Sequence, residues 1–244
     1  MTKGKKVLFV IVFLFVLAFL YRYSPRRIEF LGHYNKVFAH RVNSIEKQKQ
    51  ALQYFNGIEF DLVYFEDKNV LDVNHPPAKS IGLTFEEYLA QIDSASYPFL
   101  WLDIKKLNTT NEDAILLKLN TLFEARNYPK NKILIETRSP EALPKFTTAG
   151  YKTSYYLKPK LYQKKGKELE QEITFIDSVL VSQPNIGISS SYVDYSIMKA
   201  HFPNKTKYIW ALSSPYRIKD FSPILEDENV AIVLSSFRSF YGNR

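Results

Sequence analysis

Two carboxylates lie two residues apart in the strand-like segment GIEFDLVYF, residues 57–65. Because alternate residues of a strand face the same side, Glu59 and Asp61 point to one face and their apolar neighbours point to the other. Carboxylates held side by side away from water repel each other and resist ionisation unless a cation lies between them. The pair therefore predicts half of a site for a metal ion that prefers oxygen ligands, although the solvent face of an edge strand would show the same pattern.

A second strand-like segment, FLWLDIKKL at residues 99–107, has a similar arrangement. Asp103 and Lys105 share one strand face, which adds a third carboxylate and an ammonium group suited to phosphate. An ordinary structural ion pair is the alternative interpretation. Farther along the chain, Glu136 and Arg138 also share a strand face, either as further site residues or as a salt bridge.

Two histidines belong to the same part of the chain. In the stretch VFAHRVNS, residues 37–44, His40 and Arg41 lie side by side at the end of a strand-like run, where apolar residues would serve a buried strand better. His75 precedes two prolines, which restrict the backbone of its loop. A histidine with a pKa of about 6.5 takes up and releases protons near neutral pH. The pattern favours a place for these residues in a functional site, with a strand-capping role for His40 and Arg41 and an incidental His75 as the plainer alternatives.

Short runs of β-branched and aromatic residues alternate with amphipathic, helix-like stretches along most of the chain. The strand-like runs are residues 36–42, 57–65, 98–105, 132–138, 152–157, 185–191, 207–212 and 230–236. Helix starts are expected at Thr84, which has the capping-box spacing to Glu87, and at Ser139, which precedes Pro140. The alternation predicts an α/β fold, a (β/α)8 TIM barrel preceded by an N-terminal apolar helix. A doubly wound open sheet has the same local pattern, but no glycine-rich phosphate loop follows any of these runs.

In a TIM barrel the active site forms at the carboxyl ends of the strands. The candidate residues come from three consecutive strand–helix units and lie at or after such ends. We therefore expect one site that includes His40, Arg41, Glu59, Asp61, His75 and Asp103.

These residues together resemble a known superfamily. The order of His-Arg, Glu-x-Asp, His and an acid-x-Lys strand is similar to that of the glycerophosphodiester phosphodiesterases, the phospholipase-C-like barrels. The segments FAHRVNS, IEFDL, HPPAKSIGLTFEEYL and LWLDIKKL more specifically resemble the menorin family, a branch placed in that superfamily. The resemblance extends over residues 37–107, and the rest of the chain contributes only its strand pattern.

The resemblance implies a role for each candidate residue. Glu59, Asp61 and Asp103 would bind one divalent cation, calcium or magnesium; His40 and His75 would be the catalytic acid and base; Arg41 and Lys105 would contact the substrate phosphate. This set suits a phosphodiester, because its cleavage requires charge neutralisation on the phosphate, a base for the nucleophile and an acid for the leaving alkoxide.

The sequence also departs from the pattern of the enzymes. Val42 stands where they have glycine, Asn43 and Ser44 replace an E-N motif, Pro76 replaces an aspartate, and Asp103 replaces a glutamate. The expected function is a metal-dependent phosphodiester hydrolase that acts on a glycerophosphodiester or phospholipid-like substrate at the cell envelope. The alternative is a catalytically silent, menorin-like barrel that binds a ligand or a protein partner. A sugar-processing barrel is disfavoured, because neighbours on one strand face are poorly placed to flank a glycosidic bond.

An apolar run at residues 7–21 follows the basic segment KGKK. As a helix it spans about 22 Å, against about 30 Å for a hydrocarbon core. The lack of a small-residue cleavage site and the flanking Arg22 favour a retained single-pass membrane anchor over a cleaved signal peptide or a buried helix. The barrel would then lie outside the cytoplasm on a tether from Arg22 to Asn35, which reaches at most about 45 Å. Cleavage would instead give a secreted or periplasmic protein.

Composition limits the remaining classes. The chain has 33 basic and 25 acidic residues, but six of the basic residues precede the first acid, Glu29. The rest is nearly neutral, so we expect no nucleic-acid partner. The chain has no cysteine, which excludes disulfides, thiolate metal sites and cysteine nucleophiles. We expect two parts: residues 1–27 as the membrane anchor or signal segment, and residues 28–244 as a phospholipase-C-like phosphodiesterase barrel.

Overall fold

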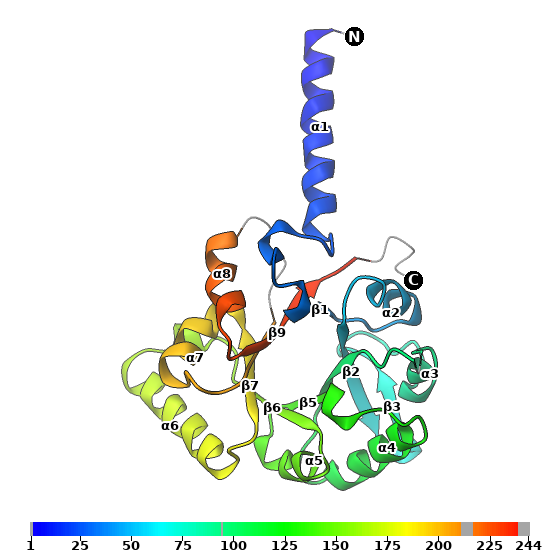
Figure 1. Cartoon of the computed structure of the whole chain (residues 1–244), viewed down its shortest axis with the longest axis vertical. Helices are drawn as coiled ribbons and strands as arrows, with labels where there is room; N and C mark the ends of the chain where they lie inside the picture. The colour runs from blue at the N-terminus through cyan, green and yellow to red at the C-terminus, as the bar shows by residue number, and fades with distance from the viewer. Residues whose placement is uncertain (1, 94, 211–216, 239–244) are drawn as a thin grey trace.

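The computed structural model describes residues 2–93, 95–210 and 217–238. Eight parallel strands form a closed barrel with helices around it (Figure 1). The barrel strands are β1 (Val37–His40), β2 (Gly57–Phe65), β4 (Phe99–Lys105), β5 (Ile133–Thr137), β6 (Lys152–Tyr156), β7 (Gly187–Ser191), β8 (Lys207–Trp210) and β9 (Val230–Ser236). Because β1 pairs in parallel with both β2 and β9, the sheet closes on itself. The TIM barrel is thus confirmed, and the open doubly wound sheet is excluded.

One short strand was not predicted. β3 (Val70–Val73) pairs antiparallel with the end of β2, and the two strands are joined by the 3-10 turn η3 (Glu66–Lys68). Asn69 follows this turn in the left-handed conformation, with φ of 49°. At the far end of the hairpin, the backbone N–H of Asn74 donates to the carbonyl of Asp61 at 3.1 Å. The hairpin therefore brings His75 back to the carboxyl end of the barrel.

The helices largely begin where the sequence indicates. They are α2 (Ile45–Ala51), α3 (Phe85–Ala90), α4 (Glu112–Glu124), α5 (Pro144–Thr148), α6 (Gly166–Ser182), α7 (Tyr195–His201) and α8 (Ile218–Glu226). The capping box of Thr84 and Glu87 is present at the start of α3. The expected cap at Ser139 is wrong: its side chain makes no capping hydrogen bond, and Pro140 opens only a 3-10 turn, η5 (Pro140–Ala142). α5 starts later, at a second proline, Pro144.

The buried apolar residues form two clusters. The larger lies between the strands and the helices and includes the outward-facing side chains of β2, Ile58, Phe60 and Leu62. The smaller lies inside the barrel and consists of Phe38, Trp101, Leu134, Tyr208, Ile232 and Leu234. A Cβ at Gly57 would lie 2.6 Å from ring carbons of Phe38, so glycine at this position lets the aromatic ring fill the barrel interior. The inner cluster forms a closed apolar floor beneath the polar strand ends.

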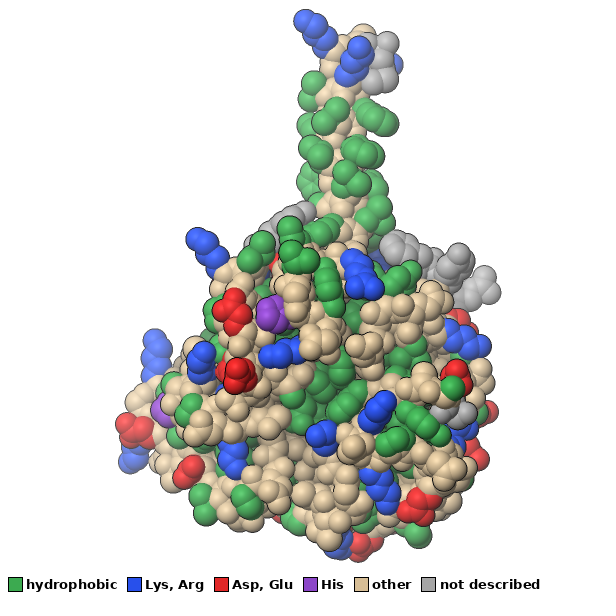
Figure 2. Space-filling view, in the orientation of Figure 1, with side chains coloured by type: hydrophobic (Ala, Val, Ile, Leu, Met, Phe, Trp, Pro, Cys, Tyr) green, Lys and Arg blue, Asp and Glu red, His purple; other side chains and the backbone are tan. Residues whose placement is uncertain are grey.

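The N-terminal apolar helix α1 (Lys3–Arg22) projects from the side of the barrel (Figure 1). None of its described side chains is buried, and Figure 2 shows apolar side chains around it and basic side chains at its far end. Its last turn is bonded to the segment that leads into the barrel. The Tyr21 hydroxyl donates to Glu29 Oε2 at 2.8 Å, and Glu29 forms an ion pair with Arg27 at 3.2 Å. Arg27 is 1% exposed, with its guanidinium 4.8 Å from the centre of the Phe30 ring.

Candidate active site

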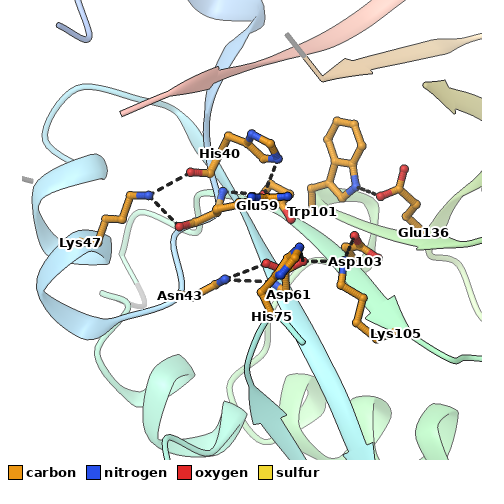
Figure 3. A network of polar contacts seen from close by, with 11 residues as sticks. His40, Asn43, Lys47, Glu59, Asp61, His75, Trp101, Asp103, Lys105 and Glu136 are labelled. Carbon is orange, nitrogen blue, oxygen red and sulfur yellow. Dashed lines mark hydrogen bonds and ion pairs between the residues drawn. The ribbon is translucent and has the colours of Figure 1, made fainter. Parts of the chain in front are cut away.

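All the residues that the sequence singled out for catalysis, phosphate binding and metal binding line one cavity at the carboxyl ends of the strands. Its volume is about 370 Å³. The predicted residues in its lining are His40, Arg41, Glu59, Asp61, His75, Asp103 and Lys105, and they are joined by Lys47, Glu136, Arg138, Tyr156, Trp210, Leu234, Ser236 and Phe237. Figure 3 shows most of the polar network and the strands that carry it.

Three carboxylates form the centre of this cavity. Glu59 and Asp61 are 3% and 1% exposed, and Asp61 is in register with Asp103 on the neighbouring strand β4. One oxygen from each of Glu59, Asp61 and Asp103 lies within 4.8 Å of the others. Burial, and then the neighbouring Asp61 charge, raises the pKa of Glu59 well above its usual value. Burial also raises the pKa of Asp103, although Lys105 partly opposes this. The cluster is therefore short of positive charge.

Lys105 supplies one positive charge to the cluster. Its Nζ lies 2.6 Å from Asp61 Oδ1 and also pairs with Asp103. Burial disfavours its charged form, but the ion pairs with Asp103 and Asp61 outweigh this and raise the pKa of Lys105. When all three carboxylates are ionised, Lys105 neutralises one of their three negative charges. One divalent cation would balance the remaining two. The donor set of clustered, buried carboxylate oxygens fits calcium or magnesium.

Asn43 fixes the orientation of the Asp61 carboxylate, a role that the sequence did not reveal. Its Nδ2 donates to Asp61 Oδ2 at 2.7 Å, and its Oδ1 accepts from the Asp61 backbone N–H at 3.0 Å. Because both amide ends of the side chain are used, the Asp61 carboxylate keeps its other oxygen turned toward Lys105 and His75. Asn43 had been noted only as a departure from the enzyme pattern.

Replacing Asn43 by alanine is expected to weaken divalent-ion affinity by about 10- to 100-fold, the usual effect of removing a group that orients a metal ligand. The Asp61 carboxylate stays in place but loses its fixed orientation. Titrating calcium or magnesium while following the thermal midpoint measures the affinity. Asn43→Asp is the stricter variant, because it keeps the size of the side chain and sets a like charge against Asp61. An unchanged affinity in both variants would contradict this role.

A left-handed turn at the end of β1 carries His40 and Arg41. Arg41 has a φ of 54°, and its backbone N–H donates to Glu59 Oε2 at 2.6 Å. Lys47, from the first turn of α2, donates to the carbonyls of His40 and Arg41 at 3.1 and 2.7 Å. These bonds hold a residue other than glycine in a conformation that side chains disfavour. Lys47, like Asn43, was missed, because nothing in its helical surroundings distinguishes it from a solvent-exposed lysine.

The two histidines face different carboxylates. His40 Nε2 lies 3.6 Å from Glu59 Oε2, and the His40 side chain is 16% exposed. Burial and then the Arg41 charge lower the pKa of His40 to about 3, so the imidazole is neutral at pH 7. His75 Nε2 lies 4.0 Å from Asp61 Oδ1, and its side chain is 33% exposed. A neutral, enclosed histidine and a more open one therefore border the same carboxylate cluster.

Glu136 lies at the buried side of the cavity and does not pair with Arg138 among the described residues. The Trp101 indole N–H donates to Glu136 Oε2 at 2.9 Å, and the Ser189 hydroxyl donates to Oε1. Burial, and then the Asp103 charge, raises the pKa of Glu136 to about 8. Glu136 and Arg138 both line the cavity, as one of the two interpretations of the sequence expected. The alternative, a salt bridge between them, is not formed among the described residues.

Comparison with known proteins identifies solved structures that have the same fold. No family model and no curated protein matches the sequence. Among solved structures, a glycerophosphodiester phosphodiesterase from Parabacteroides distasonis is 19% identical with a TM-score of 0.56, over 84% of this chain and 94% of that one. A phosphodiesterase from Oleispira antarctica, solved with the product sn-glycerol-3-phosphate, is 13% identical with a TM-score of 0.56, over 82% and 92% of the two chains. The chain thus shares its barrel fold with solved structures of glycerophosphodiester phosphodiesterases.

Proposed function

We propose that this protein is a metal-dependent phosphodiester hydrolase that cleaves a glycerophosphodiester or phospholipid-like substrate. One observation carries the proposal: a cluster of three carboxylates, two histidines and two cations lines a single cavity at the strand ends. The barrel fold shared with glycerophosphodiester phosphodiesterases supports it. Residues 28–244 would be the catalytic barrel, and the segments between residues 37 and 107 resemble those of the menorin-like branch.

In this proposal the chain's own residues bind the phosphate and move two protons. Arg41 and Lys105 neutralise the non-bridging oxygens of the phosphodiester. His40, which is neutral at pH 7, accepts the proton of the attacking hydroxyl or water as its oxygen bonds to phosphorus. His75 donates a proton to the leaving alkoxide as its bond to phosphorus breaks. A divalent cation held by Glu59, Asp61 and Asp103 would supply Lewis-acid stabilisation of the phosphate charge.

The test is an assay of the full chain in detergent micelles. A panel of glycerophosphodiesters and lysophospholipids is offered with calcium, with magnesium and with chelator, and the phosphoryl and alcohol products are measured. Turnover that requires a divalent ion supports the proposal. Absence of turnover on the whole panel, together with a calcium-dependent rise in thermal stability, would replace it with a ligand-binding barrel that has no catalytic activity.

We also propose that α1 is a retained membrane span with the barrel outside the cytoplasm. Among the described residues it is the one helix long and apolar enough to cross a membrane, and at 20 residues it is about 30 Å long, close to the core thickness. The helix thus extends beyond the apolar run that defined it in the sequence.

Alkaline extraction of membranes is therefore expected to leave the full chain in the pellet. Intact-mass analysis is expected to find the N-terminal segment still attached, because a retained span stays joined to the barrel. A control with Val12→Lys and Phe15→Lys should lose membrane retention, because the two charges destroy the apolar span. Recovery of a shortened chain in the soluble fraction would show that the segment is a cleaved signal peptide.

A further inference from the structure

A second cavity opens beside the candidate active site, over the carboxyl ends of β4 and β5. Its volume is about 440 Å³. Five residues line both cavities, so the two spaces adjoin: His75, Asp103, Lys105, Arg138 and Tyr156. The lining of the second cavity also includes Lys106, Thr137 and Ser139. Apart from His75, none of these lining residues has a part in the proton transfers proposed above.

This second cavity carries an excess of positive charge. Asp103 is its one acidic lining residue, and it already pairs with Lys105. Lys106 and Arg138 are exposed, and no carboxylate of residues 2–93, 95–210 and 217–238 forms an ion pair with either of them. Two cations at the mouth of a cavity without a partner anion attract an anionic ligand.

Arg138 is also held in a conformation suited to binding. Its guanidinium lies 4.4 Å from the centre of the Tyr156 ring, and Tyr156 in turn meets Trp210 edge to face, with the ring centres 5.8 Å apart. Stacking covers one face of the planar guanidinium, and no carboxylate of the described residues pairs with its edge N–H groups. These groups match the paired oxygens of a carboxylate or phosphate.

The strand register relates Arg138 to the phosphate site. Asp103 is in register with Glu136, the last pair between β4 and β5. Lys105 and Arg138 each lie two residues farther along the chain, Arg138 directly after the end of β5. Neighbouring strands lie about 4.8 Å apart. A ligand whose central phosphate contacts Lys105 can therefore extend one substituent to Arg138.

We infer that this second cavity is an anion subsite, in which Arg138 and Lys106 bind a carboxylate or phosphate monoester carried by one of the two alcohols of the phosphodiester. The inference rests on the proposed function and deepens it by naming the substrate class. It specifies a diester with an anionic head group in preference to a neutral or cationic one.

The test uses the full chain and two pairs of substrates, each differing by one anionic group. Glycerophosphoserine adds a carboxylate to glycerophosphoethanolamine, and glycerophosphoinositol 4-phosphate adds a phosphate monoester to glycerophosphoinositol. We expect kcat/KM to favour the anionic member of at least one pair by about tenfold, the effect of one charge-assisted hydrogen bond. The pair that shows the preference identifies the anion.

Substitutions then assign the preference to Arg138. Arg138→Gln should bring the kcat/KM ratio within the preferred pair close to one, and Arg138→Lys should retain part of it, because lysine keeps the charge without the planar fork. Lys152→Gln removes one positive charge at the start of β6, at the opposite end of the barrel, and should leave the ratio unchanged. A ratio near one in the parent, or a ratio that survives Arg138→Gln, overturns the inference.

Binding of products separates this inference from the proposed function. Isothermal titration compares phosphoserine with phosphoethanolamine, and inositol bisphosphate with inositol phosphate, and needs no turnover. If no diester is cleaved but the more anionic ligand of a pair binds about tenfold more tightly, and only when Arg138 is present, the subsite stands and the hydrolase proposal fails. If the diesters are cleaved without any head-group preference, the hydrolase stands and the subsite does not exist.

Discussion

Glu59→Gln is expected to abolish turnover while leaving the ion-free fold at least as stable as the parent. The amide keeps an oxygen that can accept the Arg41 backbone N–H, so the turn at the end of β1 persists. Losing one charged ligand of the cation is expected to lower kcat/KM by about a thousandfold or more. The thermal stabilisation that calcium or magnesium gives the parent should disappear as well.

The stability expectation follows from the raised pKa of Glu59. A carboxyl group whose pKa is higher in the folded state contributes stability at acid pH that is lost as pH rises through the folded pKa. Glutamine resembles the protonated form at every pH, so the ion-free variant should not lose this stability on going from pH 4 to pH 7. Thermal midpoints across that range, with chelator present, measure the effect.

A matched control is available on the same strand pair. Glu66, at the turn after β2, is exposed, and Glu66→Gln removes the same charge outside the cavity. It should leave turnover and ion stabilisation unchanged. If Glu59→Gln retained the ion-dependent rise in thermal midpoint, the three-carboxylate cation site would be wrong.

His40→Gln and His75→Gln are each expected to lower turnover by about 100- to 10,000-fold and to leave ion stabilisation in place, since neither histidine belongs to the carboxylate cluster. The two variants should differ in their response to the leaving group. A p-nitrophenyl phosphodiester releases a weakly basic phenolate that needs little protonation. It should therefore largely bypass the loss of His75, the proposed acid, but not the loss of His40, the proposed base.

The comparison of alkyl and p-nitrophenyl substrates therefore tests the assignment of the two roles. Rescue of His40→Gln instead of His75→Gln would exchange acid and base. Equal losses on both substrates in both variants would remove general acid catalysis from the proposal. His201→Gln, at the end of α7 and outside the cavity lining, is the control.

The alternation of apolar and polar residues along the strands made two features predictable: the barrel strands and the face on which the carboxylates lie. In β2 the apolar residues Ile58, Phe60 and Leu62 pack toward the helices, and the alternating carboxylates face the barrel interior, as the sequence indicated. Eight strands that alternate with helices predict a closed parallel barrel, in which the carboxyl ends of all the strands lie at the same end. The fold and the meeting of the candidate residues thus followed from local pattern and topology together.

Other features depend on contacts that no local pattern encodes. β3 is a short strand whose pairing with β2 is set by the hairpin turn, and its four residues read as part of a loop. Asn43 and Lys47 gain their roles only when the end of β1 lies over β2 and α2. Ser139 has the composition of a cap, but the helix it was expected to cap starts at the later Pro144.

The bonded junction between α1 and the barrel changes how the protein would search for its substrate. Arg27 is buried against Phe30, so at most residues 23–26 remain as tether instead of the longer segment allowed by the sequence. Four extended residues span only about 13 Å. With α1 in a bilayer, the cavity would travel with the membrane at a nearly constant height. Encounter with a membrane-borne phosphodiester would then be a two-dimensional diffusion problem, governed by the surface density of the lipid and not by its bulk concentration.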